Sequence, residues 1–416
     1  MNICGIITEY NPMHLGHDYQ VKSAKTLTNA GATILIMSGN FVQRGEPAII
    51  DKYARAQAAV ATGIDLVIEL PCYFATSSAE YFASYATKLL DATGVVTHLN
   101  FGSESGDLTG LKAVADILTK EPLGYKVLLN DYLKSGLSFP KARQQALIQY
   151  NENHHIISPS LIQSIQTPNN ILGIEYIKAL NRLKSTIEVT TIQRIGATYH
   201  NEDSQVAIPS ASSIRRHLES NAPLELLSDK MPTASFKKLT QAIEAKKGPI
   251  YVKDIFPYIR HQLLQSSSET LATYMDIDEG LENRFLKAIN TCTTYDDFID
   301  AVATKRYTST RIARSLIHIY LGHTKAAFNR YYKDMAPYLK VLAFNKQGQS
   351  IIKAIKEANE DLPIIVNNRQ GYKLLDPLQQ ACYMADINST LLYNHLIAMK
   401  YGTQVKNDYQ VKIMPI

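Results

Sequence analysis

Runs of apolar residues alternate with amphipathic stretches throughout the first half of the 416-residue chain. The apolar runs are short and β-rich, whereas the stretches between them repeat their apolar residues at helical spacing. The predicted strands cover residues 2–8, 32–37, 65–70, 98–101 and 188–193. The predicted helices cover residues 14–30, 52–62, 77–91, 167–183 and 210–218. This alternation predicts an α/β fold with a parallel five-stranded sheet and helices on both faces.

Two regions depart from that alternation. Residues from about 108 to 160 read as helical and interrupt the strand–helix pattern, which predicts a helical insertion. Beyond residue 222 the apolar spacing is helical almost to the end of the sequence. We therefore predict an α/β domain over 1–222, followed by a mainly α-helical domain over 223–416.

The composition is that of an ordinary globular protein, with 45% hydrophobic and 19% charged residues. No apolar run is long enough to cross a bilayer, and the first residues lack the basic start of a signal peptide. We expect no membrane partner and a cytoplasmic location. Because Cys4, Cys72, Cys292 and Cys382 are scattered without CxxC spacing, neither a metal site nor a disulfide framework is predicted.

The first predicted strand leads directly into Asn11-Pro12-Met13-His14-Leu15-Gly16-His17. Ligands of open parallel sheets bind at the carboxyl ends of the strands, and a new helix directs free N–H groups at an anion. Gly16 permits close approach of a phosphate, while His14 and His17 share a helix face and can both donate to phosphate oxygens. We take these three as the candidate catalytic residues, which stabilise charge on a departing pyrophosphate.

Two other interpretations of the histidines remain open. They are surface residues near a helix start, or they form a metal-binding pair, although no carboxylates nearby are arranged as further ligands. The position directly after the first strand favours the phosphate site.

Three further segments are candidates for anion binding. Residues 38–47 form a long loop on the same sheet edge, where Asn40, Gln43 and Arg44 can meet a phosphate or carboxylate, unless the loop is merely solvated. Lys52 and Arg55 either extend this surface or pair with Asp51 or Glu46. The run 210–216 begins a helix in which Ser212, Ser213 and Arg215 bind phosphate or the serines simply cap the helix.

These motifs together resemble the HxGH nucleotidyltransferase-like (HUP-type) superfamily, which includes adenylyltransferases and class I aminoacyl-tRNA synthetases. They look closer still to the bacterial tRNA(Met) cytidine acetate ligase family, over nearly the whole chain and in order. The matching segments are residues 5–17, 37–51, 65–71, 100–104, 168–173, 194–196, 210–215 and 308–314.

The resemblance implies a reaction in two steps. Acetate and ATP give acetyl-adenylate, and the exocyclic amine of the wobble cytidine in elongator tRNA(Met) then attacks the acetyl carbon. Mg²⁺ is expected to bridge the ATP phosphates. By position, the implied ATP site comprises Ile7, Thr8, Glu9, Tyr10, Asn11, Pro12, Met13, His14, Leu15, Gly16, His17, Asp18, Tyr19, Gln20, Gly102, Asn169 or Asn170, Arg194 and Ile195.

The charge of the second half agrees with an RNA substrate. From Lys305 to Lys356 the sequence holds 11 Lys or Arg residues and one acid, Asp334. Such a bias favours phosphate contacts, and the interleaved tyrosines 307, 320, 331, 332 and 338 could stack on unpaired bases. The alternative is a solvated helical face with tyrosines in the core. The candidate tRNA-binding residues are Lys305, Arg306, Arg311, Arg314, Lys325, Arg330 and Lys333.

Three rival functions are less consistent with the sequence. A small-molecule adenylyltransferase of cofactor synthesis has no need of a long basic helical half. A class I synthetase would carry a Lys-Met-Ser-Lys-Ser segment, which is absent here. The intact His14, Gly16 and His17 speak against a non-catalytic RNA-binding protein with a degenerate nucleotide site.

Overall fold

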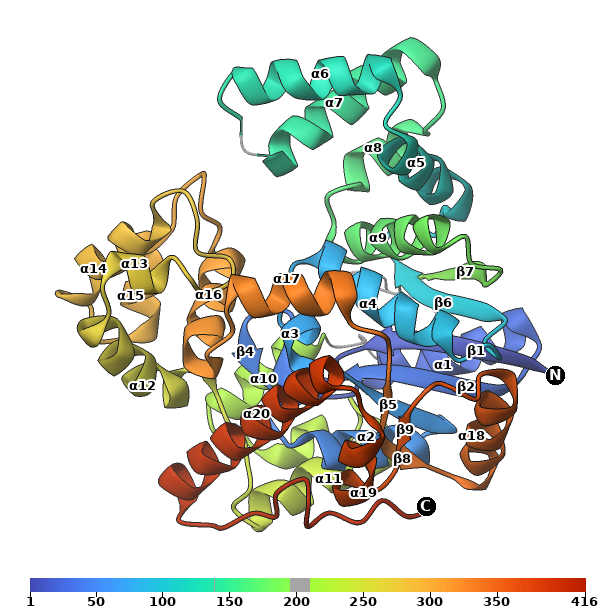
Figure 1. Cartoon of the computed structure of the whole chain (residues 1–416), viewed down its shortest axis with the longest axis vertical. Helices are drawn as coiled ribbons and strands as arrows, with labels where there is room; N and C mark the ends of the chain where they lie inside the picture. Colours follow the sequence, from blue (N-terminus) through green and yellow to red (C-terminus); the bar gives the residue numbers. More distant parts are fainter. Residues whose placement is uncertain (138, 195–209) are drawn as a thin grey trace.

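The computed structural model describes residues 1–137, 139–194 and 210–416. A seven-stranded sheet crosses the molecule in the order β7-β6-β1-β2-β5-β8-β9 (Figure 1). The strand bounds are β1 Asn2–Thr8, β2 Ala30–Ser38, β5 Leu66–Leu70, β6 His98–Ser103, β7 Glu188–Gln193, β8 Leu339–Phe344 and β9 Ile364–Ile365. The five predicted strands are all present and pair in parallel.

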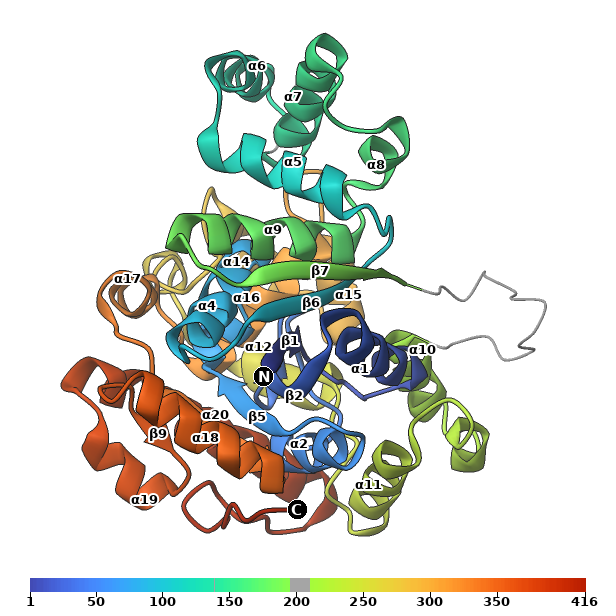
Figure 2. The same ribbon diagram turned by 90° about the vertical axis from the view of Figure 1, so that its right-hand side faces the viewer.

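The central strands are apolar on both faces because helices cover both sides of the sheet. On one side, Cys4 and Ile6 of β1 pack with α1 (Leu15–Thr28) and α2 (Lys52–Ala61). On the other side, Ile3 and Ile7 pack with α4 (Ala79–Ala92) and α9 (Pro168–Leu183). Figure 2 shows α1 and α4 on opposite sides of β1 and β2.

The sheet has seven strands, two more than the five that were predicted. Strand β8 pairs antiparallel with β5, and the two-residue β9 extends the sheet beyond it. β8 is a six-residue buried run without alternation, set among helices, so its sequence did not distinguish it from a helix core. Within the loop 38–47, a small hairpin of β3 (Phe41–Val42) and β4 (Glu46–Pro47) was also missed.

The predicted insertion is helical and projects from one end of the molecule (Figure 1). It comprises α5 Leu108–Lys120, α6 Leu123–Lys134, α7 Phe139–His154 and α8 Pro159–Ser164. The second half is mainly helical, as predicted, apart from β8 and β9. Its α-helices are α11 Thr233–Glu244, α12 Val252–Gln265, α13 Ser268–Leu271, α14 Leu281–Ile289, α15 Tyr295–Val302, α16 Ser309–Leu321, α17 Lys325–Asp334, α18 Lys346–Ala358, α19 Asn368–Gly371 and α20 Pro377–Tyr401. The first half also contains the short helix α3 Cys72–Ala75 and the helix α10 Ala211–Glu219.

The division at residue 222 stays a prediction, since the second half contributes two strands to the sheet of the first. Within the described ranges, every helix is too short or too polar to traverse a bilayer.

A buried cluster of four charges ties distant parts of the chain together beneath the sheet edge. The Lys52 ammonium lies 2.9 Å from Glu69 Oε1 and 2.8 Å from Asp408 Oδ2. Lys340 of β8 lies 2.9 Å from Glu69 Oε2 and 2.7 Å from Asp408 Oδ2. All four side chains are at most 2% exposed. Lys52 is therefore not part of an anion-binding surface, and its partners are neither Asp51 nor Glu46.

Asp386 of α20 lies next to this cluster and titrates differently. Burial and the neighbouring Glu69 raise the pKa of Asp386 to about 7. Its carboxylate accepts the N–H of Cys72 and the hydroxyl of Tyr338. Because the folded protein holds a proton that the unfolded chain releases above about pH 4, stability should fall as the pH rises from about 4 to 7.

We expect Asp386→Asn to remove this slope, which for one proton is at most about 1.4 kcal/mol per pH unit. Urea unfolding of both proteins at several values between pH 5 and pH 8 measures it. The variant should gain stability relative to the wild type as the pH rises, and parallel curves would contradict the assignment.

Candidate functional site

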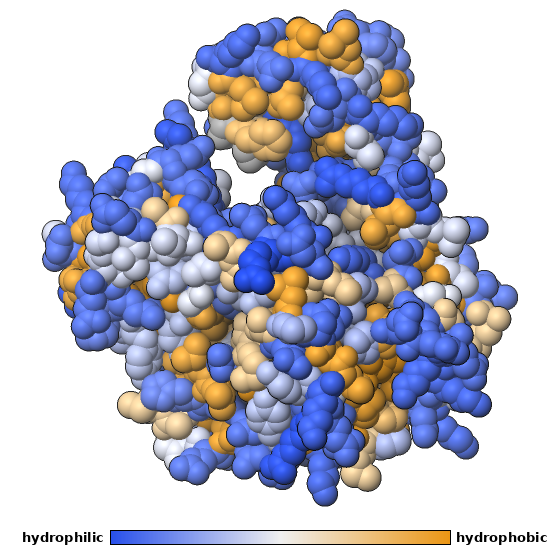
Figure 3. Space-filling model, viewed as in Figure 1, coloured by the Kyte–Doolittle hydropathy of each residue, from blue (hydrophilic) through white to orange (hydrophobic). Residues whose placement is uncertain are grey.

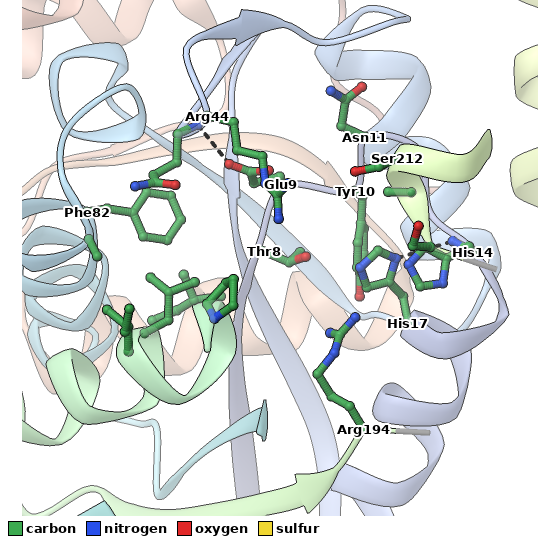
Figure 4. A pocket seen from close by; sticks show the side chains of 18 of the residues that line it. Thr8, Glu9, Tyr10, Asn11, His14, His17, Arg44, Phe82, Arg194 and Ser212 are labelled. Carbon is green, nitrogen blue, oxygen red and sulfur yellow. Dashed lines mark hydrogen bonds between the residues drawn. The ribbon is translucent and has the colours of Figure 1, made fainter. Parts of the chain in front are cut away.

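A cavity of about 470 Å³ opens at the carboxyl end of β1, between the first turn of α1 and the hairpin β3–β4. Side chains from the segment after β1 and from the segment after β7 converge on this cavity (Figure 4). The lining residues are Ile7, Thr8, Glu9, Tyr10, Asn11, His14, His17, Gln43, Arg44, Ala79, Phe82, Pro168, Ile171, Leu172, Tyr176, Arg194, Ser210, Ala211, Ser212, Arg215 and Thr310.

His14 and His17 stand side by side on the cavity wall, with ring centroids 3.9 Å apart. His14 is the N-cap of α1, and its Nδ1 accepts the N–H of Gly16 at 3.0 Å. The Nδ1 of His17 accepts the N–H of His14 at 3.2 Å. A backbone N–H can only donate, so each neutral ring carries its proton on Nε2. The pair therefore presents two N–H donors to a ligand.

Burial favours the neutral form of both rings. It lowers the pKa of His14 to about 4, with a smaller contribution from the positive charge of Arg194. Burial, His14 and Arg194 together hold the pKa of His17 well below its usual value. A polyanion bound here would raise both pKa values again, because opposite charge favours the protonated imidazole.

Gly16 has a different role from the one predicted. Its N–H donates to His14 and is not free for a phosphate. Several other residues of the motif do not line the cavity. Met13 and Gln20 are buried beneath it, Asp18 pairs with Lys22 on the surface, and Pro12, Leu15 and Tyr19 also lie outside the lining.

The loop 38–47 places two of its three predicted residues at the cavity. Gln43 and Arg44 line it, and Arg44 has no hydrogen bond or ion pair within the described parts of the chain. Asn40 is instead buried, and its Oδ1 accepts the N–H of Lys52 at 2.8 Å. Gly45 fixes the hairpin against α16, since its φ of +78° is left-handed and a Cβ would overlap the backbone at Ala313 and Arg314.

Arg55 supports this loop from below and does not face a ligand. Its guanidinium donates to the carbonyl oxygens of Glu9 and Gly39. Among the described residues, Arg55 does not make the predicted ion pair with Asp51 or Glu46, because carbonyl groups at the ends of two strands occupy its N–H groups.

The N-terminus of α10 closes another side of the cavity. Ser212 and Arg215 line it, while the Ser210 side chain caps the helix through the N–H of Ser213. Arg215 donates to the carbonyl of Asn11 at 2.8 Å and pairs with Glu46 at 2.7 Å. Ser213 does not line the cavity; its hydroxyl donates to Ser210 O.

Arg194 also borders the cavity, next to Gly102 at the end of β6. Ile195 lies outside the described residues. Of the two asparagines, Asn170 is fully buried and holds the 104–105 turn, because its Oδ1 accepts the N–H groups of Glu104 and Ser105. Asn169 is partly exposed and donates to Glu104 at 2.6 Å. Asn169 is therefore the more available to a ligand.

Comparisons with known proteins identify the family. The sequence matches the family model described as HIGH Nucleotidyl Transferase over residues 1–408. It is 39% identical over 397 residues to the tRNA(Met) cytidine acetate ligase of Acetivibrio thermocellus, covering 94% of each chain. It is 40% identical over 404 residues to that of Halothermothrix orenii, covering 94% of this chain and 95% of that protein. This chain belongs to the tRNA(Met) cytidine acetate ligase family.

The fold agrees with solved structures of Thermotoga maritima TmcAL. The structure bound with alpha-thio ATP superposes with a TM-score of 0.91 at 32% identity, covering 100% of both chains. The apo form gives a TM-score of 0.92 at 33% identity, covering 99% of both. The nucleotidyltransferase-like fold predicted for this ligase-family member is thereby confirmed.

Sequence reasoning missed the apolar wall of the site in this ligase-family chain. Ala79 and Phe82 come from α4, and Ile171, Leu172 and Tyr176 come from α9. In sequence these positions are ordinary apolar residues of amphipathic helices, so only the packing of α4 and α9 shows that their ends face a cavity. Thr310 of α16, also missed, brings the second half of the chain to the same site.

Four of the seven predicted tRNA contacts already have acidic partners. Arg306 and Arg311 pair with Glu279, Arg314 pairs with Asp276 at 2.8 Å, and Lys325 pairs with Asp278 at 2.5 Å. Lys305, Arg330 and Lys333 are exposed and have no ion pair in the described ranges. Of the interleaved tyrosines, 307, 320, 331 and 338 are buried and 332 is half-buried, as in the core alternative.

Proposed function

We propose that this protein is an ATP-dependent tRNA(Met) cytidine acetate ligase. It activates acetate as acetyl-adenylate and transfers the acetyl group to the exocyclic amine of the wobble cytidine in elongator tRNA(Met). The observation that carries the proposal is the pair of neutral histidines at the end of β1, in a chain whose relatives bear that name. The relative bound with alpha-thio ATP supports ATP as the nucleotide.

In the first step, the phosphates of ATP lie against α1. The Nε2–H groups of His14 and His17 donate to the phosphate oxygens as acetate attacks the α-phosphorus, and the positive charge of Arg194 adds to the stabilisation of pyrophosphate. Mg²⁺ bound together with ATP would supply further charge neutralisation at the phosphates. Because the acid itself is the nucleophile, the protein contributes position and electrostatics.

The other end of the cavity suits a small acid. Arg44, whose guanidinium has no ion pair among the described residues, can bind a carboxylate, with Gln43 beside it. Phe82, Leu172 and Tyr176 supply apolar surface for a methyl group. In Figure 4, Arg44 and Phe82 lie on the side away from the two histidines, so the acid and the pyrophosphate occupy opposite ends.

One assay tests the proposed function. Purified protein, ATP, labelled acetate and elongator tRNA(Met) should give acetylated cytidine, and acetate-dependent pyrophosphate exchange should occur in the absence of tRNA. Absence of both reactions would reject the proposal. A chain that exchanges pyrophosphate yet transfers acetyl to no tRNA would activate acids for another acceptor.

The tRNA surface lies on α17 rather than across the whole basic segment. In the space-filling view an open gap separates the insertion from the lobe of α12–α16, and hydrophilic side chains border much of it (Figure 3). Arg330 and Lys333 are one helical turn apart on α17 and exposed. Both can contact phosphates without first breaking an ion pair.

We expect Arg330→Glu with Lys333→Glu to weaken tRNA binding about tenfold and to lower the salt slope of binding by about two. Acetate-dependent pyrophosphate exchange should stay unchanged. Lys353→Glu with Lys356→Glu on α18 is the matched control, because it reverses two exposed lysines of a helix that packs on β2, β5 and β8. Equal weakening by both pairs would refute a tRNA surface on α17.

A further inference from the structure

The second step of the proposed reaction releases a proton. The exocyclic amine of cytosine attacks the acetyl carbon, and that nitrogen must lose one hydrogen before the amide is complete. A group that accepts this proton has to lie in the cavity, within hydrogen-bond reach of the attacking nitrogen. Of the described residues that line the cavity, Glu9 is the one carboxylate.

The other ionisable side chains there are poor proton acceptors. The lone pairs at Nδ1 of His14 and His17 are occupied by backbone N–H groups, so both rings are donors at Nε2. Arg44, Arg194 and Arg215 have no lone pair to offer. Burial raises the pKa of the Tyr10 and Tyr176 hydroxyls, which keeps both protonated.

Glu9 is held in place by its surroundings while one oxygen stays available. Its Oε1 accepts the N–H of Gln43 at 2.7 Å, and its carbonyl oxygen accepts from Arg55. Within the described ranges, Oε2 has no hydrogen-bond partner, and the side chain is only partly covered. Figure 4 shows Glu9 beside Arg44, on the side of the cavity away from the histidines. This is the end assigned above to the acid, and so to the acetyl group.

We propose that Glu9 Oε2 accepts the proton from the exocyclic amine during acetyl transfer, an inference that rests on the proposed function. The C–N bond forms as the amine attacks the carbonyl carbon. The bond from that carbon to the adenylate oxygen then breaks, and AMP leaves with the electron pair. The proton passes from nitrogen to Glu9 and from there to solvent.

The electrostatic setting of Glu9 favours proton uptake by its carboxylate. Burial raises the pKa of Glu9, while the N–H of Gln43 opposes the shift. Among charged neighbours, Glu46 on β4 raises the pKa of Glu9. Arg44, in the β3–β4 turn, and Arg215, on α10, lower the pKa of Glu9. Arg55 on α2 faces the backbone of Glu9. A raised pKa makes the carboxylate a stronger base than an exposed glutamate.

The test separates the two half-reactions. Glu9→Gln keeps an oxygen for the Gln43 N–H and cannot take up a proton. We expect single-turnover acetyl transfer to tRNA to fall at least about 100-fold, a loss far larger than any change in acetate-dependent pyrophosphate exchange without tRNA. The wild-type transfer rate should fall as the pH drops through the Glu9 pKa, and the variant should lack that limb.

Glu80→Gln is the matched control, because Glu80 follows the lining residue Ala79 but pairs with Lys178 and Arg182 outside the cavity. It should leave both half-reactions and the pH limb intact. Transfer that survives in Glu9→Gln, or an equal loss of both half-reactions, overturns the role of Glu9. A wild-type protein inactive in both half-reactions rejects the proposed function itself.

Discussion

His14→Ala should lower the rate of acetate-dependent pyrophosphate exchange by about 100- to 1,000-fold. The substitution removes one of two N–H donors aimed at the phosphates, and with it the N-cap of α1. The lost cap should also reduce the free energy of unfolding by about 1 kcal/mol. The affinity for tRNA should change little, because the histidine lies on the nucleotide side of the site.

His14→Asn distinguishes the two roles of the ring. The asparagine side-chain oxygen can accept the Gly16 N–H in place of Nδ1, so the cap persists without a donor at the Nε2 position. We expect the stability of this variant to match the wild type while exchange stays as slow as in His14→Ala. Exchange restored by asparagine would mean that His14 acts by shaping the helix start.

Asp408→Asn should reduce the free energy of unfolding by about 3–5 kcal/mol, because it leaves two buried lysines with one carboxylate. Urea unfolding measures the loss. The same change should slow adenylation, since Lys52 holds Asn40 through its N–H and thereby the base of the β3–β4 hairpin. The effect is large because no solvent reaches the unmatched charge.

Two further variants test whether the buried charge is the cause. Asp361→Asn changes an exposed aspartate and should alter stability by less than about 0.5 kcal/mol. Adding Lys340→Met to Asp408→Asn removes the excess positive charge and should recover part of the lost stability. If the double variant were no more stable than Asp408→Asn alone, lost packing rather than charge would explain the change.

The sequence was sufficient to predict the parallel strands and the position of His14 and His17 at a ligand-sized cavity, because both depend on local patterns. A strand followed directly by His14-Leu15-Gly16-His17 places the two histidines at the carboxyl end of β1. Strands β8 and β9 could not be predicted in the same way. β8 pairs with β5, which is far away in the sequence, and β9 pairs with β8. The six buried residues of β8, five of them apolar, have no period of their own.

The basic segment shows a second limit of local reasoning. Counting charges from Lys305 to Lys356 gives a strong excess, but three acids that neutralise much of it, Asp276, Asp278 and Glu279, precede that window. Lys340, counted as surface charge, is buried against Glu69 and Asp408. Net charge along a sequence therefore overstates the free charge on the surface that the fold creates.

The cluster around Asp408 also has a consequence for how the protein is made. Lys52 and Asp408 are 356 residues apart, so a ribosome must release nearly the whole chain before the two can meet. Until then, the ammonium groups of Lys52 and Lys340 have only one carboxylate of the cluster, that of Glu69, and burying both lysines against it is unfavourable. We expect the site to mature only after translation has passed Asp408. A chain that is still incomplete on the ribosome would then bind ATP poorly and would consume little ATP or acetate.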